Sequence, residues 1–186
     1  GVITVTGTNG KTTTSHLLAA AARIAGWDPL ANRSGSNLER GVVSSFIAAA
    51  DAVGAIPRAA ERLGVVELDE AVWPRLLPRL LPRVAVFLNL FRDQLDRYGE
   101  VDSIAEGWQR ALASHVTPLT LVLNVDDPSV AALAEEIVQE PEPAFSVTNP
   151  PGSITLTVNV VIVTFGLLEL ASTVTSRFPL TVRPPL

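Results

Sequence analysis

The chain has 186 residues, 47% of them hydrophobic, and a net charge of -5, so it is long enough to bury a core, and its acidic balance argues against non-specific nucleic-acid binding. The absence of cysteine excludes disulfides and thiolate zinc sites, and two histidines, His16 and His115, are too few for a histidine-based metal cage. The first residues run straight into a strand-like segment without a basic stretch and an apolar signal-type run, so we expect a cytoplasmic protein.

Strand-like and helix-like segments alternate along the first three quarters of the chain. β-branched or continuous apolar runs predict strands at residues 2–6, 63–68, 84–89 and 119–124. Segments with helix-forming composition predict helices at residues 12–25, 38–53, 103–114 and 128–138. The prolines of residues 75–83 favour broken turns over a single helix there. This alternation predicts an α/β fold, a parallel sheet flanked by helices.

The composition changes after about residue 141, where prolines punctuate the chain and charged residues become rare. Residues 154–171 carry a single charge, so we considered a membrane span there. The segment is rich in threonine and valine, contains Asn159 and Glu169, and lacks basic flanks, so strands fit better and we expect no transmembrane segment. We therefore predict an α/β domain over residues 1–141 and a β-rich tail over residues 142–186.

The segment Gly7-Thr8-Asn9-Gly10-Lys11-Thr12 lies between the first predicted strand and the first predicted helix, which is the position of a phosphate-binding loop. Glycines let the backbone wrap closely around an anion, and Lys11, the only lysine among 14 basic residues, supplies a compact charge that arginine cannot replace. The hydroxyl of Thr12 is suited to Mg²⁺. The predicted nucleotide-binding residues are Gly7, Thr8, Asn9, Gly10, Lys11, Thr12 and Thr13.

Two acidic clusters follow predicted strands, at the edge of a parallel sheet where ligands bind. Glu67, Asp69 and Glu70 follow one strand, and Asp93 and Asp96 follow the next one along the chain. Carboxylates at this edge can hold Mg²⁺ directly or through water. Glu67 is the preferred site residue, Asp93 and Asp96 are also favoured, and Asp69 and Glu70 are equally well explained as solvated loop residues.

The short loop frame GTNGKTT resembles that of the Mur ligase and folylpolyglutamate synthetase superfamily of ATP-dependent amide-bond ligases. Within this superfamily the chain is similar to the MurT family over about residues 1–140. In the stretch NLFRDQLD, ordinary Mur ligases tend to carry a histidine after the first aspartate. This chain has Gln94 at that position, and the MurT family also has a glutamine there. The matching stretches are GTNGKTTT (7–14), NRSGSNLERG (32–41), ELDEA (67–71), NLFRDQLDRYGEVD (89–102) and LNVDDP (123–128).

The resemblance implies a Mur ligase central domain that amidates the D-glutamate α-carboxyl of lipid II in peptidoglycan synthesis. ATP would convert the carboxylate to an acyl phosphate, and ammonia from a GatD-like glutaminase subunit would attack it. The resemblance implies catalytic roles for Lys11 and Glu67, Mg²⁺ contacts for Thr12, Glu67 and Asp93, and substrate contacts for Arg33 and Asn37. It also implies a cytoplasmic enzyme that reaches the inner face of the membrane through its substrate.

The chain departs from the family pattern in three ways. It has no cysteines for the zinc ribbon usual in the MurT family, no asparagine-rich adenine motif, and no second lysine that could be carbamylated. Three hypotheses stay open: an amide ligase of the MurT type, a related ligase with another acceptor, and a nucleotide-binding module that is catalytically incomplete by itself. A P-loop kinase or GTPase is disfavoured by the short loop frame and the lack of an NKxD-like motif.

Overall fold

A computed structural model describes residues 1–32, 36–91, 100–137, 154–165 and 172–182. The strands are β1 (Val2–Thr6), β2 (Asp28–Ala31), β3 (Arg62–Glu67), β4 (Val84–Phe87), β5 (Leu119–Asn124), β6 (Ile154–Phe165) and β7 (Ser172–Val182). The helices are α1 (Lys11–Ile24), α2 (Glu39–Ala49), α3 (Trp73–Leu80), α4 (Glu100–Ala113) and α5 (Pro128–Ile137), with a short 3₁₀ turn at Ala59–Glu61.

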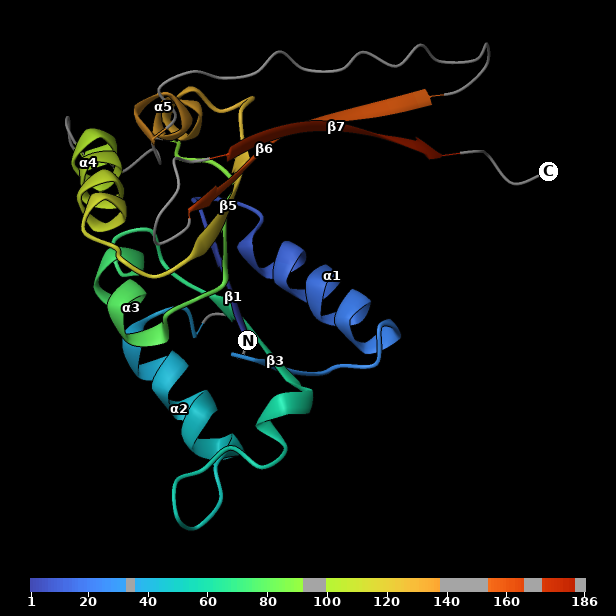
Figure 1. The fold of residues 1–186 in the computed structure, drawn as a ribbon, viewed down its shortest axis with the longest axis vertical. Helices are drawn as coiled ribbons and strands as arrows, with labels where there is room; N and C mark the ends of the chain where they lie inside the picture. Colours follow the sequence, from blue (N-terminus) through green and yellow to red (C-terminus); the bar gives the residue numbers. More distant parts are fainter. Residues whose placement is uncertain (33–35, 92–99, 138–153, 166–171, 183–186) are drawn as a thin grey trace.

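One sheet organises the described part of the chain, with strand order β2-β3-β1-β4-β5-β6-β7. The first five strands in this order are parallel, and β6 and β7 continue the sheet in antiparallel pairing. Helix α1 packs on one face, over β1, β2 and β3, whereas α3, α4 and α5 lie side by side on the other (Figure 1). The predicted α/β fold with a parallel sheet flanked by helices is therefore confirmed.

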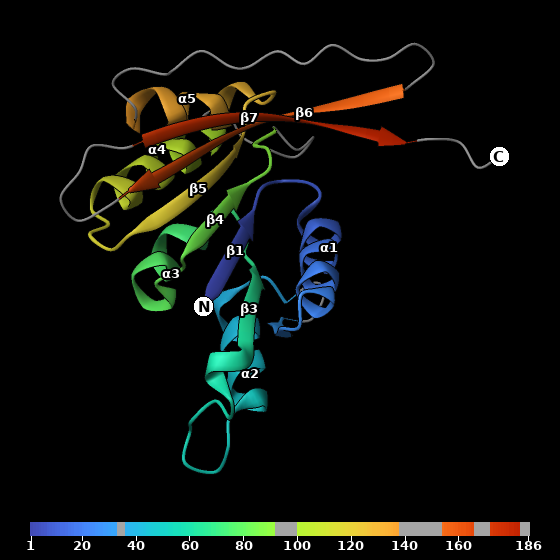
Figure 2. The ribbon, with the colours of Figure 1, turned by 45° about the vertical axis from the view of Figure 1, so that its right-hand side comes forward.

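The β-rich character of the tail is also confirmed, because β6 and β7 form a long antiparallel ribbon. Residues 160–165 of β6 pair with β5, while residues 154–159 extend beyond β5 and pair with β7 (Figure 2). No described helix has the length and apolar character to cross a membrane. The predicted boundary at residue 141 lies outside the described residues and stays a prediction.

The core between the sheet and helices α3, α4 and α5 is built around three aromatic rings. Phe87 of β4 lies between Trp73 and Trp108, with ring centroids 4.8 Å apart in both edge-on pairs. All three side chains are fully buried, so the rings join α3 and α4 to the sheet. The indole of Trp73 donates a hydrogen bond to Thr4 Oγ1 at 3.1 Å, which satisfies the polar edge of a ring inside the core.

The prediction of broken turns over residues 75–83 was wrong, because α3 is a helix through most of that range. Pro74 stands in the first turn of the helix, where a missing N–H costs no intrahelical bond. Pro82 follows the helix and does not interrupt it. Only Pro78 removes a bond from the helix interior, so three prolines in nine residues cost α3 a single hydrogen bond.

Burial explains why α3 tolerates this loss. Its residues Trp73, Leu76 and Leu77 are at most 3% exposed and lie on one face against the core. The helix ends at Leu81, which adopts a left-handed conformation (φ 44°) and donates its N–H to the carbonyl of Leu77.

Strand β2 was not predicted at all. It has four residues, Asp28-Pro29-Leu30-Ala31, with neither β-branched side chains nor alternation. It lies at the edge of the sheet and pairs only with β3, which is where a proline is tolerated in a strand. Pairing with a buried neighbour therefore overrides a weak local preference.

Replacement of Pro78 by alanine tests this account of α3. Pro78 is exposed, and an alanine N–H at this position can donate to the carbonyl of Pro74. We expect Pro78→Ala to raise the free energy of unfolding by about 1–2 kcal/mol, after allowance for the greater freedom of alanine in the unfolded chain. Urea denaturation followed by far-UV circular dichroism measures the change.

Pro74→Ala is the matched control, because its new N–H lies in the first turn and gains no acceptor within the helix. We expect no increase in stability from it. Equal stabilisation by both substitutions would show that the lost hydrogen bond at residue 78 is not the cause.

Candidate functional site

The loop that connects β1 to α1 lies at the carboxyl edge of the parallel strands (Figure 2). A pocket of about 390 Å³ opens there. It is lined by every predicted nucleotide-binding residue except Gly7, together with Asn37 and Glu67; these residues are Thr8, Asn9, Gly10, Lys11, Thr12, Thr13, Asn37 and Glu67. The structure therefore brings the predicted loop, two predicted metal ligands (Thr12 and Glu67) and one predicted substrate residue (Asn37) into one place.

The two glycines of the loop adopt backbone conformations that other residues rarely adopt. Gly7 has φ 139°, and a Cβ atom there would lie 2.9 Å from the backbone N and O of Asn89. Gly10 has φ 86° and is the N-cap of α1. The Thr14 N–H bonds to the Gly10 carbonyl at 2.9 Å, so the N–H groups of residues 11–13 precede the first intrahelical bond. Such a helix end attracts anions.

Asn89, two residues beyond the carboxyl end of β4, fixes the conformation of this loop. Its carbonyl accepts a hydrogen bond from the Thr8 N–H at 3.0 Å. Its side-chain Oδ1 accepts from the Asn9 N–H at 2.8 Å, and its Nδ2 donates to the Asn9 carbonyl at 3.1 Å. The sequence pattern gives no sign of this role, although Asn89 is the first residue of the NLFRDQLD stretch on which the resemblance rests.

Glu67, at the end of β3, lies next to Thr12. The Thr12 hydroxyl donates to Glu67 Oε1 at 3.2 Å, and Glu67 is only 4% exposed. Asn32 holds the Glu67 backbone from the other side: its Oδ1 accepts the Glu67 N–H at 2.8 Å and its Nδ2 donates to the Glu67 carbonyl at 2.9 Å. The carboxylate is thus presented to the loop from a fixed main chain.

The oxygen atoms of Thr12 and Glu67 are of the kind that Mg²⁺ prefers. Among the described residues no group of three or more histidine or acidic side chains is placed to hold a metal ion. A hydroxyl and one carboxylate fit Mg²⁺, because this ion keeps several waters and binds through one or two carboxylates and the substrate phosphates.

The ammonium of Lys11 contacts three acceptors. It donates to the carbonyls of Gly7 and Thr8, the latter at 3.1 Å, and to Glu70 Oε2 at 3.1 Å. Glu70, for which the sequence left two interpretations, therefore reaches the loop. Asp69 instead accepts the N–H of Ala71 with its side chain at 3.0 Å, as a turn residue does.

The pocket does not account for every residue that the sequence singled out. Arg33, Asp93 and Asp96 lie outside the described residues, so their roles remain predictions. His16 is exposed on α1, and neither histidine lines the pocket. Burial lowers the pKa of His115, whose Nε2 is 2.7 Å from Thr117 Oγ1, beyond the end of α4.

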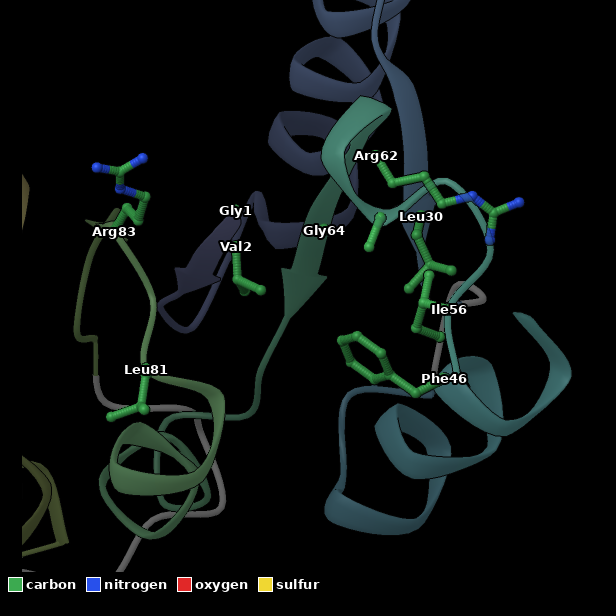
Figure 3. Close-up of a pocket in the computed structure, with 10 residues that line it drawn as sticks. Gly1, Val2, Leu30, Phe46, Ile56, Arg62, Gly64, Leu81 and Arg83 are labelled. Carbon is green, nitrogen blue, oxygen red and sulfur yellow. The ribbon is translucent and has the colours of Figure 1, made fainter. Parts of the chain in front are cut away.

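A second pocket, of about 220 Å³, opens at the opposite edge of the sheet, where β1 and β3 begin (Figure 3). Apolar side chains such as Leu30, Phe46 and Ile56 line it. Its two arginines do not make it an anion site: Arg62 Nε donates to Asp28 Oδ2 at 3.0 Å, and the guanidinium of Arg83 points away from the cavity. Of these two pockets, the loop pocket is therefore the candidate phosphate site.

Replacement of Asn89 or Asn32 by alanine tests whether each asparagine holds the backbone that it contacts. We expect Asn89→Ala to speed hydrogen exchange of the Asn9 amide by about tenfold, because that amide loses its acceptor, and to lower the free energy of unfolding by about 1–2 kcal/mol. Amide exchange followed by NMR measures the first effect and urea denaturation the second.

Asn32→Ala is the reciprocal control. It should speed exchange of the Glu67 amide and leave the Asn9 amide protected. If both variants deprotect both amides alike, the asparagines stabilise the fold as a whole and do not hold separate segments of the site.

Comparison with known proteins identifies the family to which this chain is similar. The family model of the Mur ligase middle domain matches residues 5–160. The subunit MurT of lipid II isoglutaminyl synthase (glutamine-hydrolyzing) from Staphylococcus aureus is 35% identical over 132 residues, which are 71% of this chain and 28% of that protein. The UDP-N-acetylmuramoylalanine--D-glutamate ligase of Nitrobacter winogradskyi is 35% identical over 133 residues, 72% of this chain and 26% of that protein.

The fold agrees with the same family. A crystal structure of MurF from Acinetobacter baumannii superposes with a TM-score of 0.59 at 20% identity, covering 96% of this chain and 38% of that one. The chain spans little more than a quarter of the length of the two curated relatives described above. The family match over most of the chain, together with the parallel sheet and the glycine loop, shows that the chain belongs to the Mur ligase middle domain family.

Proposed function

We propose that the chain is the nucleotide-binding core of an ATP-dependent carbon–nitrogen ligase. The observation that carries this proposal is the meeting of Lys11, Thr12 and Glu67 in one pocket at the N-terminus of α1. A lysine, a helix N-terminus and a glycine loop match the charge and shape of the phosphate chain of a nucleoside triphosphate. A hydroxyl beside a buried carboxylate matches the metal that accompanies such a phosphate chain.

Each residue has a distinct task in this proposal. The N–H groups of residues 11–13 bind phosphate oxygens, and Lys11 neutralises charge on the outer phosphates. Thr12 and Glu67 would hold Mg²⁺, which when bound neutralises charge on the transferring phosphoryl group. Gly7 and Asn89 keep the loop backbone in place, so that its donors do not have to reorganise when the ligand binds.

The acceptor that we propose is the D-glutamate α-carboxyl of lipid II. The carboxylate oxygen takes the γ-phosphoryl group of ATP and releases ADP, and ammonia then attacks the carbonyl carbon and displaces phosphate. The name of the S. aureus relative supports this acceptor, since it is a glutamine-hydrolysing lipid II isoglutaminyl synthase subunit. By the same argument a GatD-like glutaminase subunit supplies the ammonia, in the cytoplasm at the inner face of the membrane.

Substrate contacts by Arg33 and Asn37 belong to the same proposal. Asn37 lines the pocket, and its carbonyl accepts the N–H of Asp69 at 3.0 Å, which ties the segment before α2 to the loop after β3. Its position supports a contact with the acceptor beside the phosphates.

A second candidate is a nucleotide-binding module that turns over only with groups from outside this chain. The chain spans 28% of the S. aureus relative, and amide-bond formation requires an acceptor site that excludes water. A ligase of the same family with another acceptor is the third reading, which the similarity to a D-glutamate ligase supports.

Calorimetric titration with the non-hydrolysable ATP analogue AMP-PNP and Mg²⁺ tests the nucleotide site. We expect saturable binding to the 186-residue chain and a loss of about tenfold to hundredfold in affinity in Lys11→Ala, because a charged hydrogen-bond donor to phosphate is removed. Arg23→Ala is the matched control, since it removes one positive charge from the exposed far end of the same helix. Failure of a folded wild-type chain to bind would refute the nucleotide site.

Single-turnover trapping of an acyl phosphate tests the ligase chemistry separately. We expect an acyl phosphate on a lipid II analogue with a free D-glutamate α-carboxyl, and none when Glu67→Gln replaces the wild-type chain, because the metal would lose its carboxylate ligand. Hydroxylamine converts the intermediate to a hydroxamate that mass spectrometry detects. Nucleotide binding without any trapped product would favour the binding module.

A further inference from the structure

The hydrogen-bonding capacity of Lys11 is fully used in this structure. An ammonium group has three N–H donors, and Lys11 directs them at the Gly7 carbonyl, the Thr8 carbonyl and Glu70 Oε2. The Lys11 and Glu70 side chains are only 12% and 15% exposed, so water replaces these partners poorly. A phosphate that binds Lys11 must therefore displace at least one of the three.

The carboxylate of Glu70 is the partner that a phosphate can displace. The Gly7 and Thr8 carbonyls belong to the loop itself, and the loop is fixed to Asn89. Glu70 carries negative charge, as a phosphate does, and reaches Lys11 from a different element, the segment between β3 and α3. In the structure it occupies a place on Lys11 that a phosphate oxygen would take.

Glu70 cannot move far from the loop once it is displaced. The indole N–H of Trp108 donates to the Glu70 carbonyl at 2.9 Å, and Trp108 is fully buried. The Asp69 carbonyl accepts the N–H groups of Val72 and Trp73 at 3.1 and 3.0 Å, which fixes the backbone on either side. The side chain can turn away from Lys11, but its charge stays close to the phosphates.

We propose that Glu70 is an internal counter-ion of Lys11 that nucleotide replaces, and that its retained charge makes the site select metal-bound over metal-free nucleotide. The inference rests on the proposed nucleotide site and adds to it a determinant of selectivity. A displaced carboxylate near a phosphate chain repels it, and this repulsion is weaker when Mg²⁺ has neutralised part of the phosphate charge.

The two acidic residues of the ELDEA stretch then act in opposite directions. Glu67 contacts Thr12 and attracts the metal, whereas Glu70 contacts Lys11 and competes with phosphate. Removal of charge at Glu67 should weaken binding of the metal complex. Removal of charge at Glu70 should strengthen binding of the metal-free nucleotide, an effect that a purely structural contact does not produce.

The test compares AMP-PNP binding in Mg²⁺ with binding in excess EDTA, for the wild-type 186-residue chain and for Glu70→Gln. Glutamine keeps the length of the side chain and can still accept from Lys11, so the fold should be preserved; thermal melting checks this. We expect Glu70→Gln to tighten metal-free binding by about fivefold and to change binding of the Mg²⁺ complex by less than about twofold, which lowers the selectivity.

Glu106→Gln is the matched control, because it removes the same charge from an exposed residue on α4 that pairs with Arg110. It should leave the selectivity unchanged. Glu70→Asp keeps the charge but shortens the side chain, so its selectivity should stay near that of the wild type.

The outcomes separate this inference from the function on which it rests. Binding by the wild type with unchanged or increased selectivity in Glu70→Gln overturns the counter-ion role and leaves the nucleotide site standing. Binding by neither chain, in Mg²⁺ or in EDTA, overturns the nucleotide site and the inference with it. Binding in EDTA by Glu70→Gln alone supports the inference.

Discussion

The hydrogen bonds between Asn89 and residues 8 and 9 hold the glycine loop to the strand beside it. Without them the backbone of residues 8 and 9 would lose its hydrogen bonds to the segment after β4, and the loop would depend on the side-chain contacts of Thr8, Lys11 and Thr12. The close approach also explains Gly7, since a Cβ atom there would collide with the Asn89 backbone. The position of the loop therefore depends on a contact between segments 80 residues apart in sequence.

The same dependence on packing links the core to the acidic side of the site. Trp108 is buried beside Phe87 and also donates to the Glu70 carbonyl. Strand β3 carries Glu67 at its end, and Asn32, just after β2, pairs with the Glu67 backbone. The edge strand β2 therefore positions Asn32, which holds the backbone of Glu67. The aromatic core, through Trp108, restrains the segment after β3 that carries Glu70.

The sequence predicted the parts of this arrangement that depend on local pattern. The apolar runs of β1, β3, β4 and β5 and the glycine loop are visible because each combines composition with position. Helix α3 and strand β2 were not predictable in this way, because burial against the core and pairing with β3 override their prolines. Asn89 and Asn32 were missed for a related reason: an asparagine that bonds a distant backbone leaves no periodic signal, and only the fold shows its partner.

The balance of charge in the pocket follows from which acid contacts which loop residue. Among the described lining and contacting residues, Lys11 is the one cation, and Glu67 and Glu70 are both acidic. A free phosphate chain therefore meets an excess of negative charge, relieved only by the N–H groups at the start of α1. A divalent cation is instead attracted by this negative charge, and the Glu67 carboxylate and the Thr12 hydroxyl, 3.2 Å apart, offer it two oxygen ligands. Since β3 places both carboxylates within three residues of its end, one strand would set the proposed preference of the site for a metal–phosphate pair over either ion alone.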